Sequence, residues 1–140
     1  NGNDSITFVV ANDKLDFTTN IGSSLSFSGT TEVAFNGTAD VVITNKIILL
    51  VEAVDGGAST NTKTEIAADI NGAGTALELA SGGKAIVIAG NDIDAGDGAV
   101  IYLVDDSLGA VQGTISADDV VKIGTLATFD VDTLTGFNFV

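Results

Sequence analysis

Residues 85–89 read Ala-Ile-Val-Ile-Ala, and residues 99–104 read Ala-Val-Ile-Tyr-Leu-Val. Both runs are almost continuously apolar. Runs of this length without polar alternation are typical of strands that are covered on both faces. We therefore expect two central strands of a sheet at these positions, and the remaining pieces of the chain are interpreted around them.

Shorter apolar pieces flank the two runs and are separated by Gly, Asn, Asp, Ser and Thr, as expected for a β protein. Residues 24–28 place Leu25 and Phe27 on one side and serines on the other, which predicts a half-buried strand. Residues 46–54 match helical spacing, but their β-branched content favours a strand. Further strands are predicted at 5–10, 14–17, 120–126 and 137–140.

Asn36-Gly37 is the clearest turn signal in the chain. This dipeptide accepts positive φ at both central positions of a type I′ turn, whose twist suits the flanking strands. Residues 32–35 and 38–44 are therefore predicted to form a β-hairpin.

Residues 62–71 are the best candidate for a helix. Thr62 and Glu65 fit a capping box, in which each side chain satisfies a backbone amide at the helix start. A thin apolar stripe follows, and Gly72 can end the helix. Residues 75–80 are predicted to form a second short helix. The expected fold is mainly β, β-sandwich-like and antiparallel-rich, with one or two short helices; α+β is the fallback.

The 140 residues fit one compact domain, 1–140. Because the first residue is Asn and not Met, we expect a processed part or fragment of a longer chain. No apolar run reaches the about 20 residues of a membrane helix, so no direct membrane insertion is expected. The net charge of −14, from five Lys and 19 acidic residues, repels phosphate backbones and excludes nucleic acid as a partner.

The side chains that most often carry out catalysis are missing from this sequence. The chain has no His or Cys for a nucleophile–base pair and no Arg to clamp an anion. Two carboxylates could cleave a glycosidic bond, but no Trp and one Tyr make a poor platform for a sugar. We predict that the protein is not an enzyme.

The densest acidic loop lies between the two apolar runs, at residues 91–98. Calcium takes six to eight oxygen ligands, so closely spaced carboxylates on a Gly-permitted turn suit this ion. The predicted ligands are Asn91, Asp92, Asp94 and Asp97. A solvated hairpin loop is the alternative, because Asp, Asn and Gly belong there in any case.

Further acidic and amide residues are secondary metal candidates, and adjacent Asp pairs could join an ion site between strands or subunits. They are Asn3, Asp4, Asp105, Asp106, Asp118 and Asp119. The alternative is that the pairs serve caps and turns, with Asp118 capping a short turn, because Asp is preferred at such positions.

Open sheet edges are usually guarded by Pro, Lys or bulges, yet this chain has no Pro and only five Lys. Terminal strands could therefore pair with a neighbouring copy and build a homo-oligomer or polymer. The predicted assembly residues are Ile6, Phe8, Val10, Phe137, Phe139 and Val140. The alternative is that both termini pair within their own sheet.

Two stretches carry a family resemblance. Asn1-Gly2-Asn3-Asp4-Ser5-Ile6 resembles half of a nonapeptide repeat of repeats-in-toxin proteins, and residues 13–17 resemble the segment that often follows it. Residues 117–126 and 132–140 resemble the ends of large proteins exported by type I secretion, among them S-layer-like and adhesin-like surface proteins. One incomplete repeat cannot form a stacked calcium roll within this chain.

The resemblance implies a secreted protein at the cell surface, and it does not imply toxin activity. The expected function is a non-catalytic structural module of an extracellular surface layer, fibre or matrix, self-assembling and stabilised by calcium. The alternative is an adhesin-type binding module for carbohydrate or a host surface, which an exposed cluster of Phe would favour.

Overall fold

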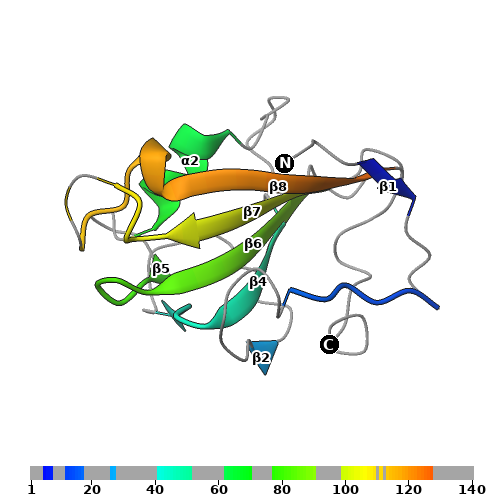
Figure 1. The fold of residues 1–140 in the computed structure, drawn as a ribbon, viewed down its shortest axis with the longest axis horizontal. Coiled ribbons are helices and arrows are strands. Elements are labelled where there is room, and N and C mark those ends of the chain that lie inside the picture. The colour runs from blue at the N-terminus through cyan, green and yellow to red at the C-terminus, as the bar shows by residue number, and fades with distance from the viewer. Residues whose placement is uncertain are drawn as a thin grey trace.

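The computed structural model describes residues 5–7, 12–17, 26–27, 41–51, 62–70, 77–90, 99–109, 111 and 113–127. Strands dominate this part of the chain, and a single short α-helix accompanies them (Figure 1). The elements are β1 Ser5–Thr7, β2 Ser26–Phe27, β3 Val41–Val42, β4 Lys46–Val51, α2 Lys63–Asp69, β5 Leu77–Glu78, β6 Lys84–Gly90, β7 Ala99–Asp105, the 3-10 helix η1 Ala117–Asp119, and β8 Val120–Ala127. The mainly β prediction is confirmed.

The described strands form two sheets. The main sheet has the order β1-β8-β7-β6-β4-β2, and its four long central strands are flanked by two short edge strands. β7 is antiparallel to both β6 and β8, whereas β4 is parallel to β6 and each edge strand is parallel to its neighbour. The sheet is therefore mixed. β3 and β5 form a second, two-stranded parallel sheet.

The two apolar runs of the sequence become β6 and β7, and β6 is buried on both faces as predicted. Val87 pairs with Tyr102 of β7, and both belong to the core cluster beneath α2. The next residue, Ile88, is equally buried but points to the opposite face and lies outside that cluster. A strand with two covered faces explains why its sequence shows no polar alternation.

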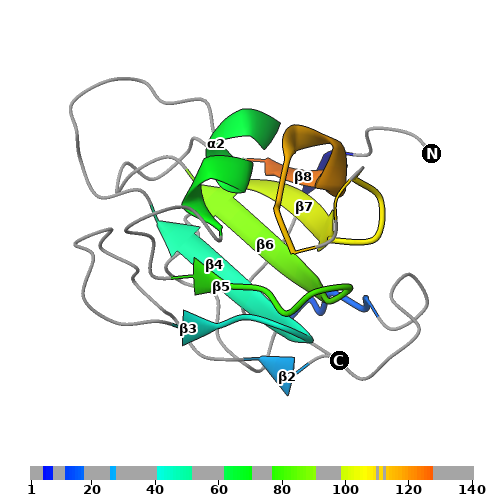
Figure 2. The same cartoon turned by 90° about the vertical axis from the view of Figure 1, so that its left-hand side faces the viewer.

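Helix α2 covers one face of the main sheet (Figure 2). It lies in the connection between the parallel neighbours β4 and β6, which require a crossover rather than a tight turn. Ile66, Ala67 and Ile70 form its buried stripe. The predicted choice of strand over helix is confirmed by β4 for residues 46–51, since a helix there could not pair with β6, and residues 52–54 lie outside the described residues.

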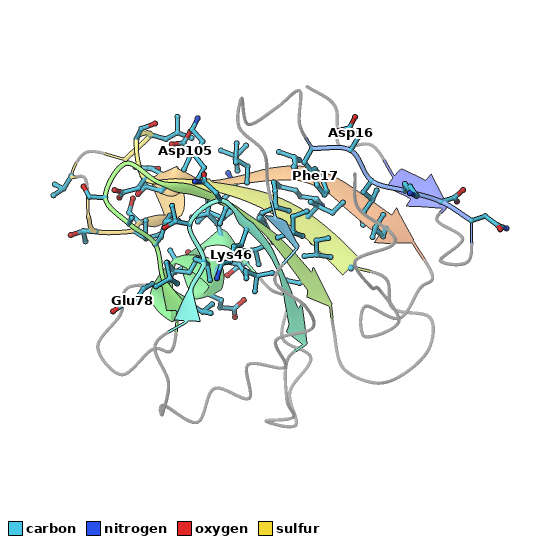
Figure 3. The ribbon with its side chains drawn as sticks, turned by 90° about the horizontal axis from the view of Figure 1, so that it is seen from below. Asp16, Phe17, Lys46, Glu78 and Asp105 are labelled. Carbon is cyan, nitrogen blue, oxygen red and sulfur yellow. The ribbon has the colours of Figure 1, made fainter. Side chains whose placement is uncertain are left out.

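Residues 12–17 lie on the other face of the sheet, opposite α2 (Figure 3). Leu15 and Phe17 are buried while Lys14 and Asp16 are exposed, so burial alternates along this segment. The predicted strand over 14–17 is wrong, because this segment contains only a single bridge residue, Leu15. Its apolar side chains pack on the sheet without the segment becoming a strand.

The second predicted helix, over residues 75–80, is also wrong. Leu77 and Leu79 are buried and Glu78 between them is exposed, which is the period-two pattern of a strand. Leu77–Glu78 forms β5 and pairs with Val41–Val42, a distant part of the chain. The Asn36-Gly37 turn of the predicted hairpin and the predicted strand at 137–140 lie outside the described residues.

A β-bulge interrupts β8. Tyr102 pairs with Lys122, but the preceding residue Ile101 pairs with Gly124, so Ile123 is an extra residue on β8. Val120 and Leu126 stand six positions apart and are both fully buried. Only Val120 belongs to the cluster beneath α2, because the extra residue shifts the alternation after it.

The predicted capping box at the start of α2 is confirmed. The Glu65 amide donates to Thr62 Oγ1 over 3.3 Å, and the Thr62 amide donates to Glu65 Oε2 over 2.6 Å. The helix ends at Asp69, two residues before the predicted end, and Ile70 forms a parallel bridge with Leu77. The end of the helix is thus set by its attachment to β5.

Thr62→Ala is expected to lower the free energy of unfolding by about 1 kcal/mol, because the Glu65 amide loses the Thr62 hydroxyl as its acceptor. Thr64→Ala makes the same substitution at an exposed position inside the helix, where Ala is favoured, and is expected to be neutral or slightly stabilising. Urea denaturation followed by circular dichroism measures both. Equal losses for the two variants would contradict the capping role.

Candidate functional site

Most of the predicted site residues fall outside the described part of the chain. These are Asn91, Asp92, Asp94 and Asp97 of the acidic loop, Asn3 and Asp4, and the predicted assembly residues Phe8, Val10, Phe137, Phe139 and Val140. Ile6 lies in β1 at an edge of the main sheet, where it is the register partner of Leu126. The four remaining candidates all lie in the described part of the chain: Asp105, Asp106, Asp118 and Asp119.

Three of these four, Asp105, Asp106 and Asp119, gather at one end of the main sheet. Asp105 ends β7, Asp106 follows it, and Asp119 directly precedes β8. Their exposed fractions are 3%, 0% and 0%. A buried carboxylate is costly unless hydrogen bonds or an opposite charge compensate it, so the partners of these oxygens decide what the cluster does.

Asp105 is compensated by a cation. Its Oδ2 lies 2.7 Å from Lys84 Nζ on the neighbouring strand β6, and its Oδ1 accepts bonds from the Ser107 amide and hydroxyl at 3.0 and 2.6 Å. Burial by itself would raise the pKa of Asp105. The hydrogen bonds from Lys84 and Ser107 outweigh burial, and the pKa lies below its ordinary value.

Asp106 joins two loops. Its Oδ2 accepts a bond from the Gly82 amide in the β5–β6 turn at 2.6 Å, and its two oxygens lie 2.9 and 2.8 Å from the Gly113 amide in the β7–β8 loop. Gly82 and Gly113 have backbone φ angles of 70° and 84°, which residues with a side chain rarely adopt. These glycines let the amides turn inward to one carboxylate.

Asp119 closes the same loop from its other end. Its Oδ1 accepts a bond from the Gly109 amide, and its Oδ2 accepts from the Ser116 amide and hydroxyl at 2.9 and 2.7 Å. A Cβ at Gly109 would collide with this carboxylate. The structure thus gives Asp119 the capping role that the sequence assigned to Asp118, which is exposed within η1.

The three carboxylates therefore act as braces for the β5–β6 turn and the β7–β8 loop. Their oxygens already accept bonds from Ser and Gly donors and from Lys84. Within the described ranges, no group of three or more His, Cys, Asp or Glu is arranged to hold a metal ion. These contacts fit the cap-and-turn interpretation of the Asp pairs.

Tyr102, the only Tyr of the chain, belongs to the core beneath α2. Burial and, secondly, the nearby Glu65 carboxylate raise the pKa of its phenol, so it stays neutral at physiological pH. Phe17 is buried as well, so it does not contribute to an exposed Phe cluster of the kind an adhesin would use. The side chains of Phe8, Phe27 and Phe35 lie outside the description.

Comparisons with protein-family models, with curated proteins and with solved structures return no significant match. None of the described helices has the length and apolar character needed to span a membrane.

Asp106→Ala is expected to lower the free energy of unfolding by about 2–3 kcal/mol, because the amides of Gly82 and Gly113 lose a charged acceptor. Asp118→Ala removes the same side chain from an exposed position and is expected to change stability by less than about 0.5 kcal/mol. Urea titration of both variants measures the difference. Similar losses would show that Asp106 does not brace the loops.

The lowered pKa of Asp105 predicts how acid acts on stability. Because the folded pKa lies below the unfolded value of about 3.9, the contribution of Asp105 is present above that pH and is lost as pH falls through the folded pKa. Lys84→Gln removes the ion pair, so acid should destabilise this variant at a higher pH than the wild type. Lys63→Gln, an exposed control with the same charge change, should follow the wild type.

Proposed function

We propose that the chain is a non-catalytic structural module of an extracellular surface layer, fibre or matrix. The observation that carries this proposal is the use of the buried carboxylates. Asp105, Asp106 and Asp119 are held by backbone amides, hydroxyls and Lys84, so these acids stabilise loops. In a chain without His, Cys or Arg, such groups favour cohesion over chemistry.

The proposed module is a sandwich-like β domain. Ile86, Ile88 and Ile101 are buried on the face of the main sheet that lies opposite α2. Phe17 is buried too and lies on that side (Figure 3), and Leu15 of the same segment is also buried. A second β layer over this face would complete a core of the sandwich type.

Assembly through strand addition is proposed at the terminal strands. β1 occupies one edge of the main sheet, and within the described residues it pairs with β8 through three register pairs. A short parallel edge strand contributes little pairing energy, so another strand could extend or replace it. The partner in this proposal is a second copy of the chain, giving a homo-oligomer or polymer.

Calcium is the proposed stabilising ion, and residues 91–98 are its proposed loop. Gly90 and Ala99 are register partners at the ends of β6 and β7, so both ends of the loop start from one fixed point of the sheet. Asn91, Asp92, Asp94 and Asp97 would then supply oxygen ligands from a short segment. Secretion to the cell surface by a type I route is proposed from the resemblance of the two chain ends.

Light scattering behind a size-exclusion column tests the proposal. The expected result is a mass that grows with protein concentration, together with a higher melting temperature in millimolar calcium. At one hundred times Kd the ion would add about 2.7 kcal/mol of stability. Asp94→Asn should weaken the calcium effect, whereas Glu78→Gln, an exposed control with the same charge change, should preserve it. A monomer at every concentration, with melting unaffected by calcium or chelator, would overturn the proposal.

A further inference from the structure

Asp119 ties two parts of the β7–β8 loop together, and both of its carboxylate oxygens are engaged. Oδ1 accepts a bond from the Gly109 amide, and Oδ2 accepts a bond from the Ser116 amide at 2.9 Å. A backbone N–H can donate a hydrogen bond but cannot accept one. A proton on either oxygen would therefore face an amide hydrogen. Only the ionised carboxylate can hold both amides at once.

Asp106 ties the same loop to the β5–β6 turn. Its Oδ2 accepts a bond from the Gly82 amide at 2.6 Å, and the Gly113 amide lies 2.9 and 2.8 Å from its two oxygens. A proton on either oxygen would oppose at least one of these amides. Bonds to an ionised acceptor are also about twice as strong as bonds between neutral groups, so a neutral Asp106 would hold the loop weakly.

Hydrogen bonds are the compensation that the structure gives these two charges. Both carboxylates are fully buried, and among the described residues no Lys Nζ forms an ion pair with either of them. Residues 79–83 and 107–116 contain no ionisable side chain. Lys84 is already paired with Asp105. The charged residues of the elements that meet at this end are Glu78 in β5, Lys84 in β6, Asp105 in β7, Asp118 in η1, Lys122 in β8, and Lys63, Glu65 and Asp69 in α2, which packs against η1 and β8.

The neighbouring end of the sheet is held by contacts that resist acid better. The Asp106 amide donates to the Gly83 carbonyl at 3.1 Å, and this bond involves no charged group. Burial alone would raise the pKa of Asp105, but the bonds from Lys84 and Ser107 lower it. The ion pair between β6 and β7 therefore persists below the pH at which an unpaired Asp takes up a proton.

We propose that acid frees the β7–β8 loop at Gly109 and Gly113 while the main sheet stays folded. Neutralising Asp119 and Asp106 removes the acceptors of these two amides, whereas Ile115 belongs to the core cluster and keeps the end of the loop attached. The loop then has a held and a released state, and the charge of the two carboxylates sets the balance between them. Release needs no second copy of the chain, so it is independent of the proposed self-assembly.

Hydrogen exchange of single amides, followed by NMR from about pH 7 to about pH 3 and corrected for the intrinsic exchange rate, tests the release. At the acid end, the amides of Gly109 and Gly113 should exchange within about tenfold of the rate of an unfolded chain. The amides of Val87 and Ile88 in β6 should remain at least about a hundredfold slower than the loop amides. Circular dichroism at each pH checks that the sheet persists.

Asn replaces the charged carboxylate by a neutral group of the same shape, so it imitates the effect of acid at neutral pH. Asp119→Asn should bring the Gly109 amide to within about tenfold of the unfolded rate while Val87 stays protected. Asp106→Asn should do the same for the Gly113 amide. Asp118→Asn, the matched exposed control, should leave both loop amides as protected as in the wild type.

Two results would overturn the acid release. The first is that loop and β6 amides of the wild type lose protection together at one pH, because the loop would then open only when the whole sheet unfolds. The second is that Asp119→Asn leaves Gly109 protected at neutral pH, because the charge would then not be what holds the amide. If an Asn variant does not fold, the acid series of the wild type decides by itself.

Discussion

The burial of β6 on both of its faces is the constraint on which the rest of the structure depends. A strand buried in this way needs hydrogen-bonded neighbours on both edges, which β4 and β7 provide, and apolar cover above and below. Helix α2 covers one face of β6. It lies in the crossover between β4 and β6, which is needed because those two strands are parallel. The opposite cover includes Phe17. The two-sided core is thus a consequence of one apolar run.

Patterns within a short stretch of sequence predicted the helices and strands that depend on interactions within that same stretch. The capping box of Thr62 and Glu65 identified α2, since both partners lie within one turn, and apolar content identified β6, β7 and β8. Residues 75–80 were mispredicted because the decisive partner of Leu77 is Val41, far away in the sequence. Buried and exposed side chains alternate over residues 14–17, as they do in a strand. Alternation alone, however, cannot distinguish a paired strand from an extended segment that packs on a sheet.

The candidate site shows the same division. The sequence singled out Asp105, Asp106 and Asp119, since adjacent acids are visible in a sequence. Their role depends on amides of Gly82, Gly109 and Gly113 that converge only in the folded chain. A glycine in a sequence does not reveal where its amide points. Before the contacts were known, the Asp pairs were therefore compatible with metal ligands as well as with turn caps, and only the general preference of Asp for caps and turns favoured the second interpretation.

The bulge at Ile123 restricts how this chain can change in length. Without the extra residue, β8 would return to a regular pleat, and Leu126 would rotate from one layer of the core into the other. Every residue of β8 after the bulge would move to the opposite face of the sheet, including the segment that pairs with β1. Insertions and deletions in this strand are therefore far more disruptive than substitutions, so divergent descendants of this sequence should retain the strand's length even where its side chains drift.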